Sequence, residues 1–127
     1  MTKAKRFLVA LASAGMLLIG AAATPIPAAA QGAGFDGTWS VVIETLRGSC
    51  PSGVRYAVQI YRGRVFPAGG GFSAGGAVAP NGAISVTVSN GQQSASGGGR
   101  LSGSYGGGSW ITSDRTCSGR WSAQRTG

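Results

Sequence analysis

The 127-residue chain contains no histidine, and its only acidic residues are Asp36, Glu44 and Asp114. Without histidine, the commonest general base and metal ligand is missing. Glycosidase chemistry needs two carboxylates that face one cleft, and nothing in the sequence brings two of these three together. Phosphate-binding loops, nucleophile elbows and dinucleotide fingerprints are also absent. We therefore predict that the protein is not an enzyme and that it holds no metal and no cofactor.

Lysine is confined to the first five residues, and no acid precedes Asp36. An apolar run from Phe7 to Ala23 follows this basic start and ends in a proline-containing exit with alanines at 28–30. A basic start, an apolar middle and a small-residue exit are typical of a cleavable secretory signal. We predict that residues 1–30 are this signal, that it is cut after Ala30, and that the protein is secreted or periplasmic with no remaining membrane span.

Cleavage would leave residues 31–127 as a single domain, of which 31–35 are expected to be flexible. This part has eight arginines against three acids, a net charge of +5. Its only cysteines are Cys50 and Cys117, and a small exported domain commonly pairs its cysteines. A disulfide across the long segment between them would contribute about 4 kcal/mol in the chain-entropy account.

The pattern of apolar residues predicts strands, because it alternates with period two and shows no sustained helical spacing. Between 83 and 89, for example, Ile84, Val86 and Val88 alternate with serine and threonine. We expect eight short strands, at 36–46, 54–61, 64–67, 72–79, 83–89, 92–103, 109–112 and 116–124.

Turn signals separate these strands. Asn81-Gly82 and Asn90-Gly91 are Asn-Gly pairs, the strongest short hairpin signal, and Arg62-Gly63 and the glycines at 106–108 mark further bends. Successive hairpins predict an all-β fold, an antiparallel meander closed into a small barrel so that no sheet edge is exposed. A Cys50–Cys117 bridge would then join the first and last strands. A two-sheet β-sandwich is the alternative.

Tryptophan always follows a glycine by two positions. The triplets are Gly37-Thr38-Trp39, Gly108-Ser109-Trp110 and Gly119-Arg120-Trp121. We interpret the glycine as leaving room for the indole, with a structural role for Gly37, Trp39, Gly119 and Trp121.

The first triplet resembles that of the calycin group, the lipocalin and avidin-like barrels, which carry a Gly-x-Trp on strand one. In lipocalins a basic residue from late in the chain packs on that indole, and the resemblance implies this place for Arg120 or Arg125. The extra tryptophans that line avidin's biotin site are absent, so biotin binding is not implied. From Phe35 to Ala123 the chain also resembles small exported proteins of alphaproteobacteria, which implies export and no particular reaction.

The function that these features favour is a non-catalytic binding module of the cell envelope for an unknown small ligand. Candidate contacts at one barrel mouth or hairpin tip are Tyr56, Tyr61, Arg62, Arg64, Phe66 and Trp110. The basic tip formed by Arg62 and Arg64 also suits an anionic envelope component. The alternatives are an inhibitor whose hairpin 61–65 inserts into an exported hydrolase, and a structural protein without a pocket. An apolar interior void would favour the small ligand, and nucleic acid is not expected.

Overall fold

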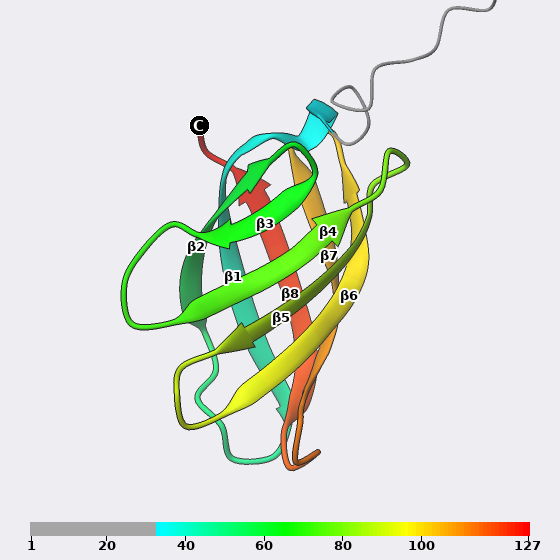
Figure 1. Ribbon diagram of the computed structural model, residues 1–127. Coiled ribbons are helices and arrows are strands. Elements are labelled where there is room, and N and C mark those ends of the chain that lie inside the picture. The colour runs from blue at the N-terminus through cyan, green and yellow to red at the C-terminus, as the bar shows by residue number, and fades with distance from the viewer. Residues whose placement is uncertain (1–32) are drawn as a thin grey trace, which may run out of the picture.

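Eight antiparallel strands form a closed barrel in the computed structural model, which describes residues 33–127 (Figure 1). The predicted secretory signal lies outside the described residues. The 3-10 turn η4 (Ala33–Phe35) precedes the strands β1 (Gly37–Arg47), β2 (Val54–Tyr61), β3 (Arg64–Pro67), β4 (Ser73–Val78), β5 (Ala83–Ser89), β6 (Ser94–Ser102), β7 (Tyr105–Thr112) and β8 (Ser118–Arg125).

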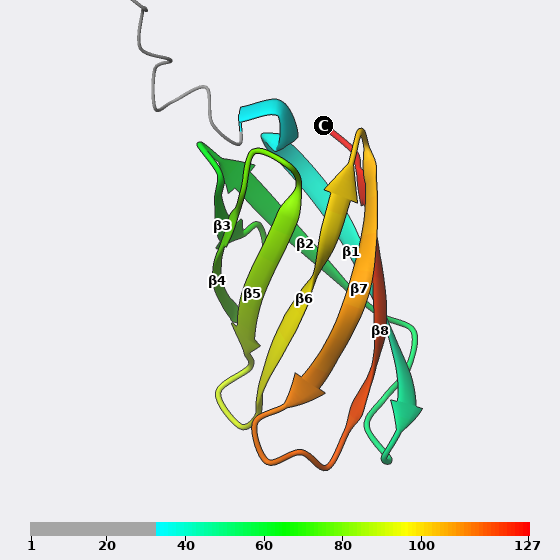
Figure 2. The ribbon, with the colours of Figure 1, turned by 90° about the vertical axis from the view of Figure 1, so that its right-hand side faces the viewer.

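Each strand pairs with the next, and β1 pairs with β8 to close the barrel (Figure 2). In that last seam Val41 lies opposite Ala123 and Ile43 opposite Trp121. The barrel predicted from the sequence is thus confirmed, and the sandwich alternative is wrong. Closure pairs β1 with β8 and so leaves neither terminal strand as a free sheet edge, as both would be in an open meander.

The two-residue hairpin turns are at Arg62-Gly63 and Gly103-Ser104 and not at the Asn-Gly pairs. Arg62 and Gly63 both have positive φ, at 52° and 74°, as a two-residue turn between β2 and β3 requires. Asn81 instead belongs to a longer turn, in which the Gly82 amide donates to the Ala79 carbonyl and only Gly82 has positive φ. Pro80 explains the difference, because its fixed φ suits the first central position of a type I turn.

The glycines at 106–108, predicted as a bend, lie inside β7. The bend between β6 and β7 is at Gly103-Ser104 instead, and the glycines at 97–99 pair with β7. Gly99 lies opposite Gly108. The glycines at 97–99 and 106–108 therefore form a stretch of the barrel wall without side chains, and the chain does not reverse at either stretch.

The two ends of the barrel differ. We call the end that carries η4 the closed end. The core gathers there around Trp39 and Ile60, each 1% exposed. Residues 33–35, expected to be flexible, form a turn whose Phe35 packs against this core. The opposite end, which carries the Cys50–Cys117 disulfide, we call the open end. Among the described residues no helix has the length and apolarity to cross a membrane.

Candidate functional site

A cavity of about 370 Å³ occupies the barrel interior and reaches the surface at the open end. Its floor is Trp39, and the exposed residues Pro51 and Asn90 belong to its rim. Its wall consists of inward-facing aliphatic and aromatic side chains from most strands, among them Val41, Ile43, Val54, Tyr56, Val58, Ile60, Ile84, Val86, Val88, Trp110 and Trp121. Alternation along each strand sends these side chains to one face.

Burial of these inward side chains falls from the closed end to the open end. Ile60 and Val58 are buried, whereas Val54 and Tyr56, nearer the open end of the same strand, are only half-buried. Along β5, Val86 and Val88 are likewise half-buried although they face inward. Since side chains that packed against one another would be fully buried, their half-burial shows that this part of the aliphatic wall faces the cavity.

Two tryptophans lie across a wall made of glycine. Trp110 on β7 stands between Gly97 and Gly119 of the neighbouring strands, and its Nε1 donates to Glu44 O of β1 at 3.2 Å. Trp121 on β8 points the other way, and its Nε1 donates to Gly98 O at 3.2 Å.

A Cβ on Gly97 would lie 3.5 Å from Trp121 Nε1, so a glycine two strands away leaves space for that indole. The interpretation that the glycine of each Gly-x-Trp triplet makes room for its own indole stays a prediction. Gly119 and Gly108 are required for another reason, since a Cβ on either would collide with a backbone carbonyl of the adjacent strand, Glu44 O or Gly98 O.

At the closed end, Arg125 covers Trp39. Its guanidinium carbon lies 5.1 Å from the indole centroid, and the group donates to the carbonyls of Asp36 at 2.6 Å, Gly34 at 2.9 Å and Gly103 at 3.1 Å. Trp39 Nε1 donates to Phe35 O at 2.8 Å. Of the two arginines expected on this indole, Arg125 is the one found there. Arg120 is exposed on the outer face, because the alternation of β8 sends it away from the interior.

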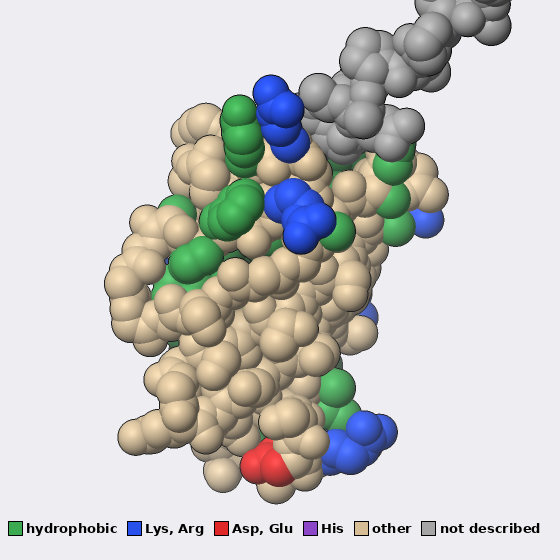
Figure 3. Space-filling model, viewed as in Figure 1, with side chains coloured by type: hydrophobic (Ala, Val, Ile, Leu, Met, Phe, Trp, Pro, Cys, Tyr) green, Lys and Arg blue, Asp and Glu red, His purple; other side chains and the backbone are tan. Residues whose placement is uncertain are grey.

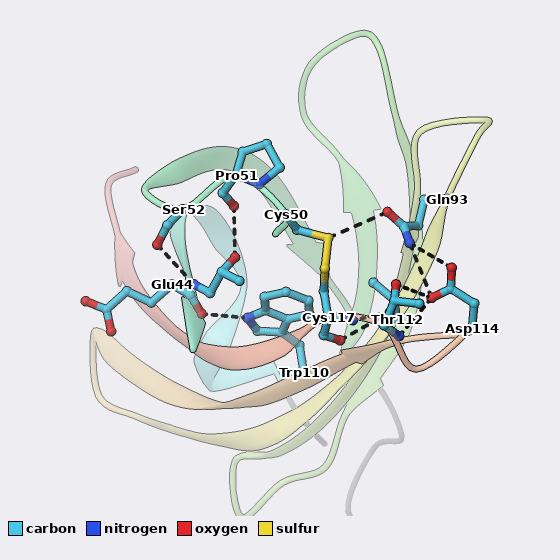
Figure 4. The surroundings of a disulfide bond; sticks show 11 residues. Glu44, Cys50, Pro51, Ser52, Gln93, Trp110, Thr112, Asp114 and Cys117 are labelled. Atoms are coloured by element: carbon cyan, nitrogen blue, oxygen red, sulfur yellow. Dashed lines mark hydrogen bonds between the residues drawn. A yellow bond between two sulfur atoms is a disulfide. The ribbon is translucent and has the colours of Figure 1, made fainter. Parts of the chain in front are cut away.

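At the open end, the disulfide and Gln93 form part of the rim (Figure 4). Cys50 follows β1 and Cys117 precedes β8, with Cα atoms 6.1 Å apart, so the predicted bridge is confirmed. Gln93 Nε2 donates to both carboxylate oxygens of Asp114, at 3.2 and 3.4 Å. The Thr116 amide and hydroxyl also donate to this carboxylate, and these bonds, the amide first, lower the pKa of Asp114.

One seam of the wall is weaker than the others. β3 and β4 share a single residue pair, Arg64 with Ala77, before the glycine-rich loop 68–72 separates them. Behind this loop Tyr56 packs edge-on against Phe72, with ring centroids 5.0 Å apart. Hydrophobic side chains are visible within the curve of the loop (Figure 3).

The predicted contact residues fall into two groups. Tyr56 and Trp110 line the cavity. Tyr61 and Phe66 face outward, 56% and 47% exposed, next to the exposed Arg62 and Arg64. Hydrophobic and basic side chains gather together over the β2–β3 hairpin (Figure 3). These four residues form a surface at the closed end, away from the cavity mouth.

The three carboxylates are dispersed. The Asp36 carboxylate accepts from the amides of Arg62 and Gly63 at the closed end, Asp114 lies at the open end, and Glu44 is exposed on the outer face. No cluster of three metal-ligating side chains occurs within 33–127. The arrangement offers a hollow apolar container and brings no acid and base together.

The residues of the cavity rim could not be predicted from the sequence. Pro51, Asn90 and Gln93 border the cavity from loops, where no periodicity indicates which way a side chain points. The wall residues could be found, since Val54, Val86 and Val88 alternate with polar residues along their strands.

No protein-family model matches this chain, and no curated protein and no solved structure is detectably similar to it.

Proposed function

We propose that this protein is an exported, non-catalytic binding module that takes a small apolar ligand into its barrel through the open end. The observation that carries the proposal is the half-buried aliphatic wall around a cavity of about 370 Å³. Ligand pockets of this kind are concave, mostly apolar and about 300–1,000 Å³ in volume. Apolar surface that a ligand removes from water stabilises the complex at about 25 cal/mol per Å².

The disulfide and the resemblance to calycin barrels support export and a carrier role. Trp39 at the floor and Arg125 over its indole repeat the arrangement that the lipocalin resemblance implies. A disulfide is typical of an oxidising compartment, which fits a protein exported by the predicted signal at 1–30.

A cavity-filling variant tests the proposal. Val86 faces inward between Gly76 and Gly97 of the adjacent strands, so Val86→Phe has room for its ring and reduces the free volume. The probe is 1-naphthylamine, an uncharged dye of about eleven non-hydrogen atoms whose fluorescence depends on the polarity of its surroundings. We expect the native protein to bind it and Val86→Phe to lose most of the binding. Thr87→Phe, on the exposed outer face of the same strand, is the matched control. Absence of dye binding by the native protein would contradict the proposal.

A second candidate function rests on the outer surface of Tyr61, Arg62, Arg64 and Phe66. Exposed aromatic rings beside arginines suit an anionic envelope component, and the same hairpin is the segment from which an inhibitor of an exported hydrolase would act. A pulldown from periplasmic extract with Arg62→Glu/Arg64→Glu as the control tests both. Equal recovery of a specific partner by the double variant would rule out a basic-tip contact.

A further inference from the structure

The cavity wall is uncharged throughout. All of the described side chains that line it are aliphatic, aromatic, hydroxyl, amide or disulfide groups. The chain between 33 and 127 carries eight arginines, but none of them lines the cavity. Arg125, which packs on the indole at the cavity floor, is engaged with backbone carbonyls outside Trp39.

The rim residues that line the cavity include two amides and the disulfide, and none of them is charged. Gln93 lies between the disulfide and Asp114 (Figure 4). Its Oε1 is 3.9 Å from the Cys50 sulfur, and its Nε2 donates to the Asp114 carboxylate. A carboxylate only accepts hydrogen bonds, which fixes Nε2 on the Asp114 side. The sulfur of a disulfide carries no proton, so Oε1 of Gln93 keeps its capacity to accept from a ligand hydroxyl.

A charged head group would find no charged partner among the described residues that line the cavity. Asp114 lies beyond Gln93 and does not line the cavity. Removing an unpaired charge from water is far more costly than removing a hydroxyl that forms a hydrogen bond.

The volume limits the size of the ligand. At about 30 Å³ for each water-sized group, a cavity of about 370 Å³ holds roughly a dozen non-hydrogen atoms.

We propose that the cavity selects uncharged amphiphiles of roughly this size, such as a medium-chain alcohol, over the carboxylate or ammonium compound of equal chain length. This inference rests on the proposed function. The apolar chain of the ligand lies along Val54, Val86 and Val88, and its hydroxyl meets Gln93 at the rim.

Matched probes test this selectivity. We would titrate the full protein at pH 7.4 with 1-decanol, sodium decanoate and decylamine, each below the concentration at which it self-associates, and follow binding by calorimetry. We expect 1-decanol to bind at least about tenfold more tightly than either charged compound, because each ion must leave water unpaired. Equal or tighter binding of decanoate or decylammonium, with the dye still bound, would overturn the selectivity and leave the proposed function intact. If the dye and all three compounds fail to bind, both proposals fall.

A designed cation provides a second test. Val88 faces the cavity near its rim, whereas Thr87 beside it faces solvent. Val88→Arg places a guanidinium where its long stem can follow the wall toward water, and we expect its ratio of decanoate to 1-decanol affinity to rise at least about tenfold. Thr87→Arg adds the same charge outside and should leave the ratio unchanged. An equal rise in both variants would show that net charge and not the cavity sets the selectivity. If Val88→Arg fails to fold, the comparison of probes on the native protein still decides the proposal.

Discussion

Arg125 has the most connected side chain at the closed end. Its guanidinium joins the η4 turn, the start of β1 and the β6–β7 turn through carbonyls of Gly34, Asp36 and Gly103. It also covers Trp39, whose indole is the floor of the cavity. The side chain therefore seals the closed end by bonding backbone groups that lie far apart in the sequence.

Replacing Arg125 with methionine keeps an apolar stem over Trp39 but removes these bonds. We expect Arg125→Met to lower the free energy of unfolding by about 2 kcal/mol, the scale of hydrogen bonds to a charged group. Urea unfolding measures the change. Arg120→Met, at an exposed position on the same strand, should change stability by less than about 0.5 kcal/mol. Equal effects of the two variants would contradict the role assigned to Arg125.

Asp114 makes one part of the stability depend on pH. The Thr116 amide, followed by the hydroxyl of that residue, lowers the pKa of the Asp114 carboxyl below its ordinary value of 3.8. A lowered pKa in the folded state means that the ionised form stabilises the fold. This contribution is complete above the unfolded value and is lost as the pH falls through the lower folded value.

We accordingly expect Asp114→Asn to remove the part of the stability that the native protein loses as the pH falls below about 4. Thermal unfolding of both proteins at pH 6 and at a series of values below 4 measures it. The difference in unfolding temperature between the native protein and Asp114→Asn should be constant from pH 5 to 7 and shrink below pH 4. A difference that grows as the pH falls would contradict the assigned direction of the pKa shift.

At the scale of strands, the glycine-rich pair β6–β7 determines the interior. Gly97, Gly106 and Gly108 face inward without side chains, and the indoles of Trp110 and Trp121 lie across this wall. Larger residues there would displace the indoles into the cavity. The glycine content thus creates space in the barrel and does not make its strands flexible.

Two glycines of these strands give a matched comparison. A Cβ on Gly108 would collide with Gly98 O, whereas a Cβ on Gly98 would have only Ile84 O in its vicinity, at 3.7 Å. We expect Gly108→Ala to cost about 1–3 kcal/mol, as overpacking does, and Gly98→Ala to be neutral or slightly stabilising. Chemical denaturation of the two variants and the native protein measures both changes in unfolding free energy. Similar stability of both would mean that the close approach of β6 and β7 is not needed.

The sequence predicted the strands better than the interior. Alternation placed β2, β3 and β5 at their observed ends and identified Val54, Val86 and Val88 as inward-facing, because one buried face imposes period two. It did not show that the glycines at 106–108 lie within a strand, because glycine is common both in bends and where two backbones approach closely. Nor did it show that Phe66 faces outward, since β3 has only four residues, too few for a clear alternation.

For the whole molecule, the disulfide sets both stability and the shape of the open end. It joins the segments after β1 and before β8 across a sequence separation of 67 residues. Closing a loop of this length in the unfolded chain corresponds to about 4 kcal/mol in the chain-entropy account. A barrel of this size, hollow toward one end, has little apolar burial to replace that contribution.

We expect Cys50→Ser/Cys117→Ser to lose about 4 kcal/mol of unfolding free energy and to bind the uncharged dye more weakly, because Gln93 and Pro51 lose their fixed neighbour. Denaturant unfolding and dye titration measure the two effects. Reduction of the native protein should reproduce both. Full stability after reduction would exclude a structural role for the bridge.

The overall design is a container sealed at one end by a tryptophan and an arginine, open at the other beside a disulfide, and uncharged inside. Nuclear magnetic resonance of isotope-labelled protein during titration with 1-decanol tests this claim most directly. We predict shifts at the methyl groups of Val54, Val86 and Val88 and at the indole N–H of Trp110, while the outward Tyr61, Arg64 and Phe66 stay unchanged. Shifts that gather on those outward residues and spare the valines would contradict it.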